Sequence, residues 1–168
     1  MIMTGEYIRD RFGTVVLHPQ WSQFCITQLP AMAACAVMVI GWRMNWFHIG
    51  EAFLIIGMFI FTFLLCQAAY IARVEYIITD EQIIYLHGIL HRETDFMELY
   101  RVVDYQEKRT LMQQMAGLKD VVIYSMDQNT PVLTILGMKG KLKLIDSIRE
   151  RVETNKKRKG IYEITNRM

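Results

Sequence analysis

The sequence has few of the residues on which catalytic and metal sites depend. It contains three cysteines in 168 residues, Cys25, Cys35 and Cys66, and none belongs to a C-x-x-C pair. All three lie in or beside apolar stretches, which argues against a disulfide framework or a thiolate metal site. No glycine-rich phosphate loop, nucleophile elbow or H-E-x-x-H motif occurs. We therefore expect no catalysis, no cofactor and no bound metal.

The remaining polar clusters have plain structural interpretations. His87 and His91 are four residues apart, which suits a metal on a helix, but the intervening Gly88 indicates a strand that breaks. Strand alternation puts Glu93 and Asp95 on one solvated face, so an acid–base pair is not expected.

The charge balance excludes a broad basic surface. Residues 73–138 carry six basic and ten acidic side chains, whereas residues 139–168 carry ten basic and four acidic ones. An acidic body with a basic tail is not the pattern of a nucleic-acid binder.

Long apolar runs dominate the first half of the chain. Residues 52–72 contain no charged side chain or histidine, and as a helix they span about 31 Å, close to the hydrocarbon thickness of a bilayer. Residues 24–42 form a second uncharged run. The connection at 43–51 is short and carries aromatic anchors, so the two runs predict an antiparallel transmembrane hairpin. Both chain ends then lie on one side, which we expect to be the cytoplasm.

The first run has two further features. Pro30 predicts a kink or a helix that begins near it. Small residues predict close approach to a neighbouring helix, although simple tolerance of small side chains explains them equally well. The expected helix-packing face is Ala31, Ala34, Cys35 and Met38.

After Arg73 the spacing of apolar residues changes to the pattern that is typical of strands. We expect a short helix at 110–116 ending at Gly117 and a last helix at 141–157 with an apolar stripe of Leu142, Ile145, Ile148 and Val152. Expected extended segments lie at 14–17, 74–79, 82–87, 89–94, 101–107, 120–125 and 131–136, with a short apolar piece at 97–100.

These segments carry a family resemblance. The patterns are Tyr76-x-Ile78-Thr79-x-Glu81-x-Ile83, Gly88-Ile89-Leu90-x-Arg92, Met97-x-Leu99-x-Arg101-Val102-x-Asp104-Tyr105 and Val121-Val122-Ile123-Tyr124. In this order after a helix pair, over about residues 18–160, they resemble membrane-anchored bacterial pleckstrin-homology (PH) domain proteins.

The resemblance implies a seven-stranded, bent antiparallel barrel closed at one end by the C-terminal helix, and no enzyme. Eukaryotic relatives clamp phosphoinositides with basic residues in the first strand-to-strand loop. The turn that we align with that loop, Thr79-Asp80-Glu81-Gln82, is acidic, so we do not carry that site over.

The expected fold class is therefore an α+β membrane protein: an N-terminal transmembrane helical hairpin, then a PH-like bent antiparallel β-barrel capped by a C-terminal helix. The expected parts are a juxtamembrane segment (1–23), the hairpin (24–72), the PH-like domain (73–160) and a tail (161–168). The expected location is the bacterial cytoplasmic (inner) membrane, as a multi-pass protein.

Two functional interpretations remain. The first is a protein-interaction or assembly scaffold that binds itself or another membrane protein. Leu111, Met112 and Met115 are a candidate adaptable contact surface, although burial in the barrel is the favoured interpretation for at least two of these three. The second is a sensor of anionic membrane lipid, for which a solvated helix end is the alternative explanation. Its contact residues are Lys139, Lys141, Lys143, Lys156, Lys157, Arg158 and Lys159.

Overall fold

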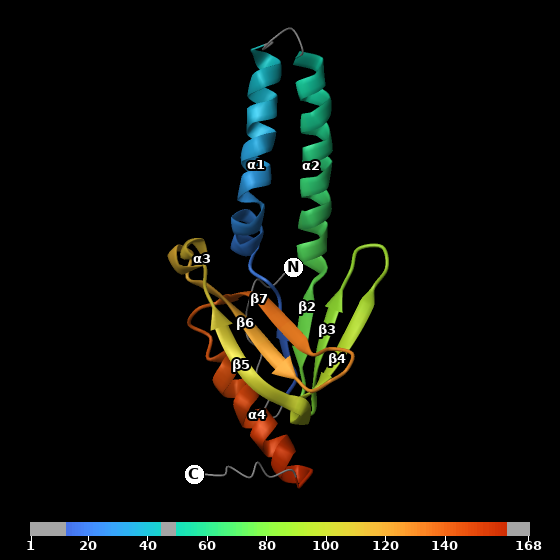
Figure 1. The fold of residues 1–168 in the computed structure, drawn as a ribbon, viewed down its shortest axis with the longest axis vertical. Helices are drawn as coiled ribbons and strands as arrows, with labels where there is room; N and C mark the ends of the chain where they lie inside the picture. Colours follow the sequence, from blue (N-terminus) through green and yellow to red (C-terminus); the bar gives the residue numbers. More distant parts are fainter. Residues whose placement is uncertain (1–12, 45–49, 161–168) are drawn as a thin grey trace.

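The computed structural model describes residues 13–44 and 50–160. It consists of a long helical hairpin standing on a domain of two antiparallel sheets and a C-terminal helix (Figure 1), which we call the β-domain. The expected connection with aromatic anchors includes residues 45–49, and the expected tail is residues 161–168; both fall outside the described residues.

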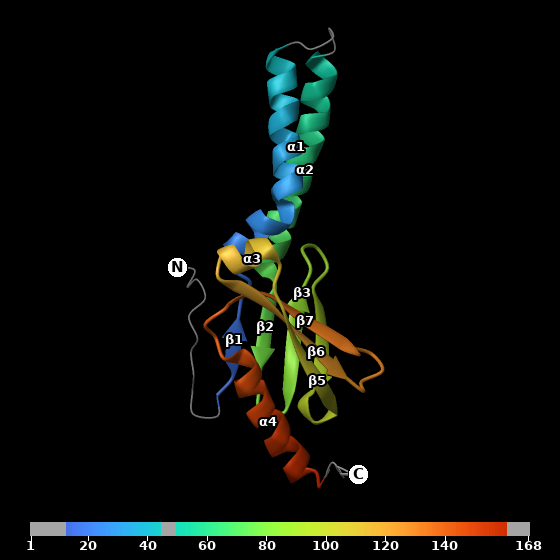
Figure 2. The same cartoon turned by 60° about the vertical axis from the view of Figure 1, so that its left-hand side comes forward.

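The hairpin pairs α1 (Trp21–Arg43) with α2 (Gly50–Arg73). Both helices are long and apolar enough to cross a membrane, with mean hydropathies of 1.9 and 2.3 over their most apolar windows. Their side chains point mostly outward. α1 continues through Pro30, and its first turns bend away from the axis of the rest (Figure 2), so the kink is confirmed.

The first sheet has the strand order β1-β2-β3-β4. β1 (Val15–Leu17) precedes the hairpin but pairs with β2 (Glu75–Ile78), with Val15 opposite Ile78. β3 (Gln82–His87) and β4 (Glu93–Glu98) complete it. The β-domain is therefore built from both sides of the hairpin.

This order corrects the loop assignment made from sequence. The connection between the first two strands of the sheet is the hairpin itself, and residues 79–81 join the second and third strands. The error arose because β1 lies far from its partner strand in the sequence.

The second sheet has the order β5-β6-β7, formed by β5 (Val102–Lys108), β6 (Leu118–Ser125) and β7 (Val132–Lys139). A 3-10 turn, η2 (Leu99–Arg101), carries the chain from one sheet to the other. The seven expected strands are present, but the expectation of a closed barrel is wrong. Strand ladders join the strands into two separate sheets because the chain turns a corner between β4 and β5.

α4 (Leu144–Arg158) packs against the core between the sheets. Leu144, Ile148 and Val152, four residues apart, are buried. Ile148 and Val152, with the partly buried Ile145 that packs against the core, confirm three of the four residues of the expected stripe, whereas Leu142 precedes the helix. The core also contains Tyr76, Ile78, Ile83, Met97, Leu99, Val121, Ile123, Leu133 and Ile135.

Two local expectations have different outcomes. α3 (Leu111–Met115) is present, and Gly117 follows its C-cap residue, Ala116, with a φ of 67°, the left-handed conformation expected at that position. The expected extended segment at 89–94 is wrong for its first four residues, because the chain turns there and β4 begins at Glu93.

Candidate functional site: the junction of hairpin and β-domain

A buried pair of amides joins α1 to α3. Gln113 Nε2 donates to Gln23 Oε1 at 3.0 Å, and the two residues are 2% and 7% exposed. Gln113 Oε1 also accepts from the Thr110 backbone N–H at 2.8 Å, while Thr110 Oγ1 accepts from the Gln113 N–H at 3.3 Å. One glutamine thus completes the capping box of α3 and binds the first turn of the hairpin.

Gly137 on β7 provides the second connection. Its φ is +63°, and a Cβ added there would lie 2.6 Å from Gln23 Cβ, so only glycine fits against this part of α1. The Gly137 carbonyl accepts from the Gln20 N–H at 3.1 Å, and its N–H donates to Asp120 Oδ1 at 2.7 Å. The start of α1 is therefore fixed to α3 and to β7.

A cavity of about 240 Å³ lies at the same junction. Its lining includes Phe24, Thr27, Gln67, Tyr70, Tyr85 and Leu136. The hydroxyls of Tyr70 and Tyr85 lie 3.4 Å apart. Burial, and then the hydrogen bond with Tyr70, raises the pKa of Tyr85, and burial raises the pKa of Tyr76. Both phenols stay neutral at physiological pH.

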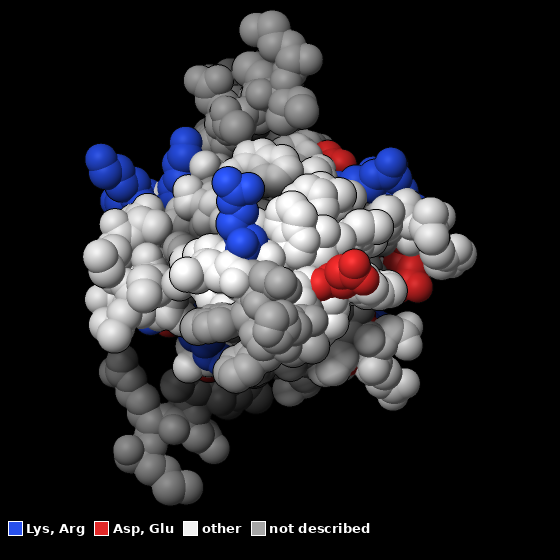
Figure 3. Space-filling view, turned by 90° about the horizontal axis from the view of Figure 1, so that it is seen from above, with Lys and Arg blue, Asp and Glu red and all other residues white. Residues whose placement is uncertain are grey.

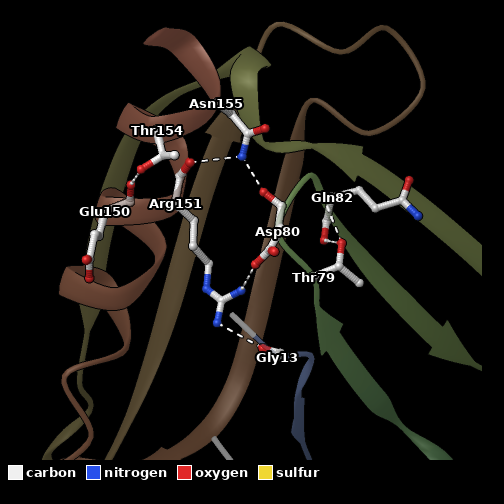
Figure 4. Close-up of polar contacts among 8 residues, drawn as sticks. All are labelled: Gly13, Thr79, Asp80, Gln82, Glu150, Arg151, Thr154 and Asn155. Carbon is white, nitrogen blue, oxygen red and sulfur yellow. Dashed lines mark hydrogen bonds and ion pairs between the residues drawn. The ribbon is translucent and has the colours of Figure 1, made fainter. Parts of the chain in front are cut away.

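At the opposite end of the β-domain, α4 is held to the turn between β2 and β3 (Figure 4). Arg151 donates to Asp80 Oδ1 at 3.0 Å and to the Gly13 carbonyl at 3.1 Å. Asn155 Nδ2 donates to the Asp80 carbonyl and, at 2.9 Å, to the Arg151 carbonyl. The acidic turn therefore binds a helix of its own chain.

The histidine and carboxylates of β3 and β4 form a small polar cluster. His87 Nε2 lies 3.1 Å from Asp95 Oδ2 and 3.8 Å from Glu93 Oε2, so the two carboxylates share a face as expected. Within residues 13–44 and 50–160, no group of three or more His, Cys, Asp or Glu side chains is placed to hold a metal ion.

The expected helix-packing face lies on the side of α1 that is partly covered. Ala31, Ala34, Cys35 and Met38 are half-buried, whereas Met32 and Ala33 are exposed. The Cys35 thiol lies 3.8 Å from the Gly57 carbonyl, and a Cβ added at Gly57 would lie 3.3 Å from Met38 Cβ. At least Cys35 and Met38 therefore contact α2 of the same chain.

The seven cationic residues assigned to lipid form two separate groups. Lys139, the last residue of β7, and Lys141 and Lys143, which lie between β7 and α4, are exposed. Lys156, Lys157, Arg158 and Lys159 lie at the end of α4, which Figure 1 shows pointing away from the hairpin. Lys159 Nζ stands 3.6 Å from the ring centre of Tyr100.

The three apolar residues of α3 point into solvent. Leu111, Met112 and Met115 are all exposed, so the favoured expectation that at least two of them are buried is wrong. The reason is that α3 uses Gln113, a polar residue, as its buried side chain. The role of Gln113 was missed, although Thr110-x-x-Gln113 is a capping-box pattern that is visible in the sequence.

Two antiparallel sheets of four and three strands with a C-terminal helix define a PH-like domain, here carried on an apolar hairpin. Residues 24–152 match the family model described as "Bacterial PH domain". This match covers more than half of the chain, which therefore belongs to the bacterial PH domain family. No curated protein and no solved structure matches the chain.

Proposed function

We propose that this chain is a membrane-anchored, multi-pass, non-catalytic scaffold whose PH-like domain binds further copies of itself or another membrane protein. The observation that carries this proposal is the junction of α1 with α3 and β7. The buried Gln23–Gln113 pair and the glycine contact hold the hairpin and the β-domain together, which gives the domain a set orientation relative to the hairpin. A fixed orientation suits a domain that presents a surface to a partner.

The proposed location is the bacterial cytoplasmic membrane, with both termini in the cytoplasm. Support comes from the antiparallel hairpin, which returns the chain to the side from which it entered, and from the outward apolar side chains on both helices. The bacterial character of the family agrees with this location.

Self-association cannot rely on the whole small-residue face of α1, because Cys35 and Met38 on that face already contact α2. A second copy would use the outer faces of the hairpin, where side chains such as Phe59 are exposed, or the β-domain.

The test is the mass of the full-length chain in mild detergent, corrected for bound detergent, over a range of protein concentrations. Self-association predicts one discrete multimer that persists on dilution. A monomer at every concentration would refute self-association, and cross-linking of the full-length chain in its native membrane would then show whether a different membrane protein is the partner. A chain that neither self-associates nor cross-links to any protein contradicts the scaffold.

Contact with anionic lipid is a second candidate. The observation that favours it is the exposed basic end of α4, with Lys157, Arg158 and Lys159 at the surface. This end points away from the hairpin, so the proposed contact is with a second membrane rather than the anchoring one.

The matched test starts from the full chain in phosphatidylcholine proteoliposomes, mixed with fluorescent vesicles that contain phosphatidylglycerol. Changing the four basic residues 156–159 to Gln should abolish vesicle capture. Changing Lys139, Lys141 and Lys143 to Gln should have a smaller effect. Capture that is unchanged by the first set contradicts this candidate.

A further inference from the structure

Two parts of the β-domain reach the level at which the hairpin enters it. One is α3, and the other is the turn between β3 and β4, residues 88–92. Figures 1 and 2 both place them beside the base of the hairpin, and Figure 1 shows them on opposite sides of it. A membrane that the hairpin spans would begin at this level, because the apolar part of α1 starts within a turn of its first residue, Trp21.

Both parts expose apolar side chains that the protein itself does not cover. Leu90 in the turn is fully exposed, and Leu111 and Met115 on α3 are 78% and 86% exposed. We call Leu90, Leu111, Met112 and Met115 the apolar tips. Large apolar side chains gathered at one end of a domain are typical of surfaces that meet a partner or a membrane.

Each tip is tied to the base of one helix of the hairpin. Gln113, in the middle of α3, donates to Gln23 in the first turn of α1 at 3.0 Å. Arg73, the last residue of α2, donates to the Ile89 carbonyl next to Leu90 at 3.0 Å. The height of both tips relative to the hairpin is therefore fixed by hydrogen bonds rather than by loose loops.

Cationic residues accompany both tips. Arg92, two residues after Leu90, lies 3.8 Å from Glu75 Oε2, and Lys108 and Arg109, of which Arg109 pairs with Glu107, directly precede α3 and its cap; all three cations are exposed. Figure 3, which looks onto this end, shows mostly uncharged side chains with Lys and Arg, and fewer Asp and Glu, around them. Apolar side chains flanked by cations match the boundary between acyl chains and anionic headgroups.

We propose that the apolar tips insert into the headgroup region of the same membrane that the hairpin spans, one tip on each side of the hairpin. The occupant of this surface is the lipid bilayer, not a protein. The domain then rests on the membrane at three places, the hairpin and the two tips, which sets its tilt. This inference rests on the proposed membrane anchoring.

The test measures the depth of nitroxide labels on the full chain in liposomes of phosphatidylcholine and phosphatidylglycerol. Cys25, Cys35 and Cys66 are first replaced by Ala. A single cysteine is then introduced in separate variants, L90C and M115C for the tips, F59C for the middle of α2, and M126C as the matched control. Met126 is 77% exposed and follows β6, whose end points away from the hairpin in Figure 1. Collisions of each label with oxygen and with a water-soluble nickel chelate report its depth.

The proposal predicts three classes of label. The label at 59 collides with oxygen and is shielded from the nickel chelate. The labels at 90 and 115 show intermediate depth, with nickel collisions several-fold lower than at 126. If the labels at 90 and 115 match the label at 126 while 59 is buried, the tips do not insert and the anchoring stands. If 59 is also open to nickel, the anchoring fails and the inference fails with it.

Discussion

The buried amide pair between Gln23 and Gln113 makes a quantitative prediction. Replacing Gln113 with Ala removes the donor to Gln23 Oε1 and the acceptor for the Thr110 N–H. The stranded Gln23 oxygen is almost fully buried, and the loss costs about 1 to 3 kcal/mol. Loss of half of the capping box adds roughly 0.5 to 1 kcal/mol. The expected destabilisation of the junction is about 1.5 to 4 kcal/mol in total.

Native-state hydrogen exchange of the β6 and β7 amides in the full chain measures this change directly. A loss of 2 kcal/mol accelerates exchange by roughly thirty-fold, at about 1.36 kcal/mol for each factor of ten. The double-mutant cycle with Gln23→Ala should give a coupling energy on the order of 1 kcal/mol. Gln114→Ala, at an exposed neighbour on α3, is the control and should change stability by less than about 0.5 kcal/mol. Additivity of Gln23→Ala and Gln113→Ala within about 0.3 kcal/mol would refute the reasoning.

Three further predictions concern other parts of the chain. Arg151→Lys keeps the charge but leaves one of two acceptors without its donor, and should lower the free energy of unfolding by about 1 to 2 kcal/mol in chemical denaturation. Hydrogen bonds from Lys119 and then Arg109 hold the pKa of Glu107 below its ordinary value of 4.5. The stability that this carboxylate adds is therefore complete above pH 4.5 and is lost as the pH falls through the lower folded-state pKa. Chemical denaturation as a function of pH should show this loss of unfolding free energy in the unaltered chain and not in Glu107→Gln. Gly57→Leu places a large side chain against Met38 and should widen the separation of α1 and α2, measured by spin-label distances.

Each of these has a matched control. Glu153→Gln changes an exposed residue of α4, and Glu81→Gln removes an exposed carboxylate from the turn between β2 and β3. Glu153→Gln is the control for Arg151→Lys, and Glu81→Gln is the control for Glu107→Gln. Neither control should change stability as its test variant does. Met58→Leu changes an outward residue next to Gly57 and should leave the helix separation unchanged. If a control variant has the same effect as its test variant, the contact described for the test variant does not explain that effect.

Much of this fold could be predicted from local sequence. The charge-free runs predict α1 and α2 because a helix of that length on the surface of a soluble domain has a polar face, and these runs have none. The Gly117 cap and the β2–β3 turn also follow from neighbouring residues. These elements are determined by side chains a few positions apart.

The rest depends on contacts across long stretches of chain. Val15 pairs with Ile78 around the whole hairpin, and no local pattern encodes that pairing, so the first loop was misplaced. Gln23 resembles a tolerated polar residue until Gln113, 90 positions later, is seen to bind it. The exposure of Leu111 and Met115 follows from the burial of Gln113 between them, which periodicity in a five-residue helix cannot show.

The central claim is that the hairpin and the β-domain form one oriented body at the membrane. The direct measurement is the distance distribution between spin labels in the full chain in lipid nanodiscs, with Thr62→Cys on α2 and Glu153→Cys on α4 after the native cysteines are replaced by Ala. A rigid junction predicts one narrow distance peak that broadens when Gln113→Ala is added. A broad distribution in the unaltered junction would contradict the claim.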